Sequence, residues 1–238
     1  MPTEQHLKTE HQWKDLVLNE SAFQLLAKLF DAAKQKQSIN ALFYGPAGTG
    51  KTLAATLLGK ELGTDVVRID LAGLVSQYIG ETEKNLRELF SRAETKNWVL
   101  VFDEADLLFG KRTSVKDSHD RYSNLVPSYL MQRINEYNGI VVCESNKKSN
   151  IDDSFVRRLQ YVIHFPIPGP AERLVLWYRG LIKNNLSIDR NDLREIANNF
   201  ELSAAAISKV TKQLGQGSAE SNAGMILSNI IANAANKK

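Results

Sequence analysis

A chain of 238 residues is long enough for one large domain or two unequal domains with a well-buried hydrophobic core. Because 43% of the residues are hydrophobic and 24% are charged, the composition excludes an intrinsically disordered protein and is typical of a soluble globular one. The formal net charge of +3 is too small for a dedicated nucleic-acid-binding protein, so we expect no nucleic acid among its partners.

The polar N-terminal segment has no apolar stretch of the kind found in a secretory signal peptide. The longest apolar runs, such as residues 98–102 and 139–143, are strand-sized and far below the ~20 residues that span a membrane. The lone Cys143 cannot form an intramolecular disulfide, which favours a reducing compartment. We therefore expect a cytoplasmic protein without a membrane partner.

The first motif follows the short apolar segment 40–44, which is typical of a buried strand. Residues 45–52, GPAGTGKT, fit the pattern G-x-x-x-x-G-K-[ST] and lead into a predicted helix over residues 50–61. The glycines let backbone amides turn toward phosphates, and the helix N-terminus adds partial positive charge. We expect Lys51 to reach the β- and γ-phosphates and the Thr52 hydroxyl to ligate Mg²⁺. The predicted phosphate-binding residues are Gly45, Pro46, Ala47, Gly48, Thr49, Gly50, Lys51, Thr52 and Leu53.

Strands and helices alternate through the first two-thirds of the chain. This alternation predicts an α/β fold with a parallel five-stranded sheet that is covered by helices on both faces. We place this nucleotide-binding domain at residues 1–168, with residues 1–38 leading into it, and expect residues 109–124 to form a loop. The predicted strands are 41–44, 66–70, 99–102, 140–143 and 161–165, and the helices after the first are 81–95 and 125–136.

The second motif is a pair of carboxylates, Asp103 and Glu104, at the end of the apolar strand 99–102. Ligands in α/β proteins bind at the carboxyl ends of the strands. We expect Asp103 to hold Mg²⁺ through water and Glu104 to polarise the water that attacks the γ-phosphate. An acidic turn after a strand is common, so the motif indicates hydrolysis only in combination with the phosphate-binding loop.

Three prolines at positions 166, 168 and 170 break regular structure, and only helical patterns follow them. We therefore predict a small helical lid domain over residues 169–238. The expected helices are 171–183, 190–199, 203–214 and about 219–236.

The two motifs, followed by a helical lid, resemble the AAA+ ATPase module, which implies ATP as the nucleotide. Residues 77–83, QYIGETE, are similar to the pore loop of AAA proteins that thread or remodel polypeptides. The resemblance thereby implies that Tyr78, Ile79 and Gly80 contact a protein substrate. A core tyrosine at the start of a helix is the alternative interpretation of Tyr78.

Two further segments resemble catalytic elements of the same family. Residues 141–146, VVCESN, are similar to the strand that ends in sensor 1, which implies that Asn146 bonds the attacking water or the γ-phosphate. Residues 150–159 resemble the segment that ends in two arginine fingers, here Arg157 and Arg158, which the family inserts into a neighbouring subunit's site. The alternatives are an ordinary turn asparagine and two exposed arginines.

Other parts of the chain narrow the resemblance or depart from it. Residues 120–124 and 128–133 are most similar to bacterial AAA ATPases that accompany contractile injection systems. The lid carries Ala204, Ala205 and Ala206 where many relatives have glycines and others a phosphate-sensing arginine. Because alanines do not bind phosphate, nucleotide sensing by this lid is in question.

The resemblance implies an ATP-hydrolysing motor that assembles as a ring, a hexamer, and remodels or threads a protein substrate. An ATP-dependent assembly switch without threading is the alternative from another class. A nucleic-acid-acting ATPase is a third possibility, which the weak net charge disfavours.

Overall fold

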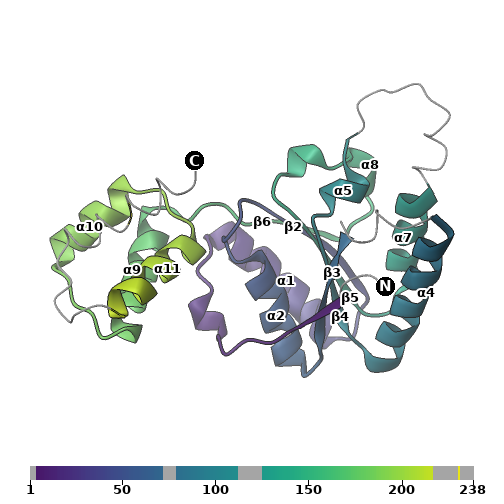
Figure 1. Ribbon diagram of the computed structural model, residues 1–238, viewed down its shortest axis with the longest axis horizontal. Helices are drawn as coiled ribbons and strands as arrows, with labels where there is room; N and C mark the ends of the chain where they lie inside the picture. The colour runs from purple at the N-terminus through teal and green to yellow at the C-terminus, as the bar shows by residue number, and fades with distance from the viewer. Residues whose placement is uncertain (1–3, 72–78, 112–124, 217–229, 231–238) are drawn as a thin grey trace. The chain divides into compact units, whose positions relative to one another are not determined.

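The computed structural model describes residues 4–71, 79–111, 125–216 and 230 (Figure 1). The chain divides into two compact units. The first comprises Met1–Leu16, Ser21–Gly45 and Lys51–Phe165, and the second comprises Val17–Glu20, Pro46–Gly50 and Pro166–Lys238.

A six-stranded sheet in the order β1-β3-β4-β5-β2-β6 forms the centre of the first unit. Strands β2 to β6 run parallel to one another and confirm the predicted α/β fold. The additional strand β1 pairs antiparallel with β3 at the edge, and its four mostly polar residues gave no apolar pattern that could have predicted it. The strands are β1 Glu4–Leu7, β2 Ile39–Tyr44, β3 Val66–Asp70, β4 Val99–Asp103, β5 Ile140–Ser145 and β6 Tyr161–His164.

Helices cover both faces of this sheet, with α4 and α7 on one face and α1 and α2 on the other (Figure 1). Helix α4 buries Leu86, Leu89, Phe90 and Ala93 completely, because their spacing places them on one side of the helix. The helices and short 3-10 turns of this unit are η1 Trp13–Asp15, α1 Glu20–Lys34, α2 Lys51–Leu62, α4 Ile79–Lys96, α5 Asp106–Phe109, α7 Leu125–Glu136, η2 Lys148–Asn150 and α8 Asp153–Val156.

The two faces of the central strand β5 have different environments. Val141 and Cys143 belong to the apolar core beneath α4 and α7. Successive side chains of a strand point to opposite faces, so Val142 and Glu144 face the side of the sheet that α2 covers. All six residues of β5 are buried, and a carboxylate therefore lies inside the protein next to the start of α2.

The described part of the second unit contains three helices that pack around a small apolar core. They are α9 Pro170–Lys183, α10 Arg190–Asn199 and α11 Ala204–Gly215, each within one residue of the predicted ends. Buried Arg173 joins this unit internally, since its guanidinium donates to the carbonyl oxygens of Ala197 at 2.7 Å and Pro168 at 2.6 Å. The predicted helix over residues 219–236 lies outside the described residues, apart from buried Ile230. Among the described residues, no helix is both long and apolar enough to cross a membrane.

Candidate nucleotide-binding site

The phosphate-binding motif joins β2 to α2 and contains three glycines with positive φ. Gly45, Gly48 and Gly50 have φ values of +146°, +76° and +106°, where side chains are strongly disfavoured. A Cβ atom on Gly45 would lie 2.0 Å from the carbonyl oxygen of Phe165. Glycine is therefore required at the first position by both conformation and space.

Lys51 is the first residue of α2, and only 7% of its surface is exposed. Its Nζ donates a hydrogen bond to the carbonyl oxygen of Gly45 at 2.7 Å, which fixes the ammonium group beside the loop. Burial lowers the pKa of Lys51, while the charges of Glu144 and Asp103 oppose that shift. A buried positive charge thus lies at the Gly45 carbonyl oxygen, with the carboxylates of Asp103 and Glu144 near it.

Asp103 and Glu104 follow one another at the carboxyl end of β4. Asp103 forms an ion pair with Arg68 of the neighbouring strand β3, and its Oδ1 accepts a hydrogen bond from the backbone N–H of Glu104 at 2.9 Å. Glu104 is exposed and has φ +52°, the left-handed conformation that non-glycine residues rarely adopt. Such strain occurs preferentially at functional sites. The turn is held by the N–H of Ala105, which donates to the carbonyl oxygen of Glu144 at 2.8 Å.

Glu144 is a site residue that the sequence interpretation missed. Its Oε2 accepts a hydrogen bond from the Thr52 hydroxyl at 2.7 Å, although only 2% of the residue is exposed. Its Oε1 is buried without a hydrogen-bond partner among the described residues. Burial raises the pKa of Glu144 to about 7, and the bond from Thr52 offsets only part of the shift. A carboxylate inside an otherwise apolar strand was the signal available in the sequence, as was Arg68 in β3.

Asn146 follows β5 directly and is exposed. Because β5 lies beside β4, Asn146 and the acidic pair emerge at the same edge of the parallel sheet. Ser145 orients this end of the strand, since its Oγ donates to Oδ1 of Asp106 at 2.9 Å. The sensor role of Asn146 stays a prediction.

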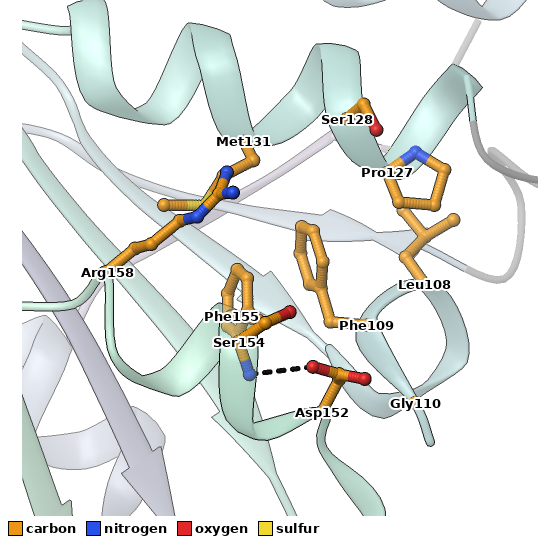
Figure 2. A pocket seen from close by; sticks show the side chains of 10 residues that line it. All are labelled: Leu108, Phe109, Gly110, Pro127, Ser128, Met131, Asp152, Ser154, Phe155 and Arg158. Carbon is orange, nitrogen blue, oxygen red and sulfur yellow. Dashed lines mark hydrogen bonds between the residues drawn. The ribbon is translucent and has the colours of Figure 1, made fainter. Parts of the chain in front are cut away.

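Arg157 and Arg158 follow the short helix α8, and both are exposed. Arg158 lines a pocket of about 270 Å³ between α5, α7 and α8, where its side chain extends toward Met131 (Figure 2). The rings of Phe109 and Phe155 stack in this pocket with their centroids 3.8 Å apart. An exposed guanidinium group at the rim of this pocket suits contact with another molecule, and the finger role of Arg157 and Arg158 stays a prediction.

The predicted pore loop lies largely outside the described residues. Tyr78 is not among them, while Ile79 and Gly80 are the first two residues of α4. The lid residues Ala204, Ala205 and Ala206 form the first turn of α11, which Ser203 caps through a hydrogen bond from the Ala206 N–H to its Oγ at 3.3 Å. The substrate role of the loop and the nucleotide response of the lid stay predictions.

The oxygen atoms around Lys51 fit a magnesium ion that is shared with phosphates. No group of three or more His, Cys, Asp or Glu side chains able to hold a metal occurs among the described residues. Mg²⁺ in nucleotide sites uses one or two carboxylates together with substrate phosphates and water. The Thr52 hydroxyl and the carboxylate of Asp103 match that requirement, with Glu144 as the acceptor of the Thr52 proton.

Comparison with known proteins identifies the family of the chain. The model of the "ATPase family associated with various cellular activities (AAA)" matches residues 41–167. The cell division cycle protein 48 homolog of Archaeoglobus fulgidus is 31% identical over 199 residues, which are 79% of this chain and 26% of that protein. Proteasome-activating nucleotidase 2 of Halobacterium salinarum is 29% identical over 198 residues, 78% of this chain and 47% of that protein. The chain thus spans about a quarter to a half of these relatives.

Solved structures share the fold at lower sequence identity. The FIGL-1 AAA domain superposes with a TM-score of 0.74 at 19% identity, covering 96% of this chain and 85% of that domain. The same domain in complex with ADP gives a TM-score of 0.72. Because the family model covers more than half of the sequence and the fold agrees, this chain belongs to the AAA family of ATPases.

Proposed function

We propose that this chain hydrolyses ATP in a Mg²⁺-dependent reaction and acts as a ring-forming motor that remodels or threads protein substrates. The observation that carries the proposal is the arrangement of a buried lysine and a hydroxyl at the start of α2 and an acidic pair at the end of β4. These residues are Lys51, Thr52, Asp103 and Glu104.

Each of these residues has a chemical task that its surroundings suit. The buried Lys51 ammonium supplies a fixed positive charge for the β- and γ-phosphates. Thr52 and Asp103 would hold Mg²⁺, which neutralises the charge on the phosphate oxygens when it is bound. Glu104 is exposed on a turn that Asp103 holds, so its carboxylate is free to accept a proton from the attacking water.

We infer ring assembly from the exposed arginines after α8. In related phosphoryl transfers an arginine supplied by a neighbour raises the rate by ~10³ to 10⁵. If Arg157 and Arg158 complete the site of an adjacent subunit, an isolated chain hydrolyses ATP poorly.

Mass determination and rate measurement on the same samples test the proposal. We expect a hexamer in the presence of ATP and Mg²⁺, and a hydrolysis rate per chain that rises with protein concentration as rings form. A monomer whose rate per chain is the same at all concentrations would rule out a shared site.

The likeness to a proteasome-activating nucleotidase supports a protein substrate over the assembly-switch alternative. The Tyr78→Ala variant separates the two, because a motor that grips its substrate through this side chain loses remodelling while basal hydrolysis continues. Unchanged remodelling of a protein substrate would favour the switch. The association with contractile injection systems stays a prediction from the sequence.

A further inference from the structure

We propose that Glu144 is a positioning residue that orients the Thr52 hydroxyl for Mg²⁺, so that the effect of Mg²⁺ on nucleotide binding depends on this pair. The inference rests on the proposed function, since it concerns the same nucleotide site.

The geometry of the pair supports this role. Glu144 lies on the central strand β5, on the face that α2 covers, and Thr52 lies in the first turn of α2. The Thr52 hydroxyl has one proton and two lone pairs. Donation of that proton to Oε2 of Glu144 at 2.7 Å fixes the rotation of the hydroxyl and leaves its lone pairs free for a cation.

The other carboxylate at this edge is already engaged. Asp103 accepts the backbone N–H of Glu104 through Oδ1 and pairs with Arg68 through Oδ2. In the described structure the acceptor for the Thr52 proton therefore comes from β5 and not from β4.

A glutamate at position 144 lowers the stability of the folded state, which argues against a purely structural role. Burying a carboxylate with an unpartnered oxygen destabilises the folded state. An apolar side chain would fit the pattern of β5 better, because the other residues of its apolar run, Val141, Val142 and Cys143, are completely buried. A carboxylate within a buried apolar strand is a departure from the local pattern of the kind expected at functional sites.

The test measures the dissociation constant of a fluorescent ADP analogue in Mg²⁺ and in EDTA. The constant in EDTA divided by the constant in Mg²⁺ reports how much Mg²⁺ strengthens binding, independently of hydrolysis. We expect Glu144→Ala and Thr52→Val each to lower this ratio about tenfold, as expected for the loss of one charge-assisted hydrogen bond. Because Glu144 acts through Thr52, the double variant should lose no more than either single variant.

Two further variants separate positioning from folding. Glu144→Gln keeps an oxygen acceptor and the side-chain volume, so its ratio should stay within about threefold of the wild type. Thr56→Val is the matched control, since Thr56 donates to the Thr52 carbonyl oxygen at 2.6 Å one turn along α2 and should leave the ratio unchanged.

The outcomes separate this inference from the proposed function. An unchanged ratio in Glu144→Ala, effects that multiply in the double variant, or a tenfold loss in Glu144→Gln would each overturn the role of Glu144. If Glu144→Ala does not fold, Glu144→Leu takes its place, because leucine fills the space but cannot accept the Thr52 proton; the same tenfold loss is expected, and an unchanged ratio would overturn the role. A wild-type protein that binds the analogue equally in Mg²⁺ and EDTA would refute the proposed Mg²⁺-dependent site itself.

Discussion

The carboxyl ends of β2 and β4 both adopt backbone conformations that side chains disfavour, but they do so with different residues. At the end of β2, Gly45 has φ +146° and leaves no room for a Cβ atom. At the end of β4, Glu104 has φ +52° and keeps a full side chain, which is exposed. Gly45 adopts its conformation because glycine has no side chain, whereas Glu104 keeps its side chain despite the strain. The difference supports the proposed roles, in which the backbone acts at Gly45 and the carboxylate acts at Glu104.

The largest expected effect tests the carboxylate of Glu104. Glu104→Gln removes the general base while preserving the volume, so we expect the hydrolysis rate to fall by ~10² to 10⁴ with nucleotide affinity retained. Steady-state hydrolysis and equilibrium nucleotide binding measure the two quantities. The exposed Glu61→Gln at the end of α2 is the control, and a Glu104 variant as active as this control contradicts the assignment.

The second prediction concerns Lys51, whose ammonium group donates to the carbonyl oxygen of Gly45 at the end of β2. Lys51→Ala removes the charge that faces the phosphates, and we expect nucleotide affinity to fall roughly 100-fold. Titration with a fluorescent nucleotide provides the measurement, with Lys84→Ala on the exposed side of α4 as the control. Equal affinity in the two variants would mean that the loop does not bind phosphate.

Gly45→Ala measures the steric requirement at the end of β2. The new Cβ atom would meet the Phe165 carbonyl oxygen, so we expect the free energy of unfolding to fall by roughly 3 kcal/mol. Gly63→Ala is the matched control, because Gly63 also has positive φ, +67°, but its Cβ atom would have no neighbour within 4 Å. That control should cost only about 1 kcal/mol. Similar losses in urea unfolding of both variants would show that conformation alone matters.

The smallest expected effect has the opposite sign. Glu104→Gly relieves the left-handed conformation, so we expect the free energy of unfolding to rise by about 1 kcal/mol while hydrolysis is lost. Asn97→Gly is the control, since Asn97 has φ +53° and asparagine tolerates this region better. A Glu104→Gly variant that is less stable than the wild type would show that Glu104 is not strained.

The sequence predicted those parts of the fold whose pattern is repeated over many residues. Apolar runs define strands β2 to β6, and the spacing of apolar residues defines helices α4 and α9 to α11. The buried residues of such elements recur at the period with which the backbone returns side chains to one face. Helix α1 lies within the segment interpreted only as leading into the domain, although Ala22, Leu26 and Leu29 bury one of its faces. Strand β1 was missed because an edge strand needs few apolar residues.

The candidate site was predictable where its residues are neighbours in the chain. The loop before Lys51 and the pair Asp103 and Glu104 each form a local motif. Glu144 was not predictable in this way, because its partner Thr52 lies 92 residues earlier and only the pairing of the strands brings the two together. Arg68 was missed for the same reason, since its contact with Asp103 depends on the alignment of β3 with β4.

In the ion pair between Arg68 and Asp103, the guanidinium group is a counter-ion of Asp103 that is part of the protein itself. The hydrogen bond to Asp103 is the main cause of the raised pKa of Arg68, and the charges of Asp103, Glu144 and Asp70 contribute to it. A divalent cation that takes Asp103 as a ligand, directly or through water, must compete with this guanidinium group. Cation binding is then an ion exchange, whose strength depends on how readily Arg68 transfers to another anion at the same edge of the sheet.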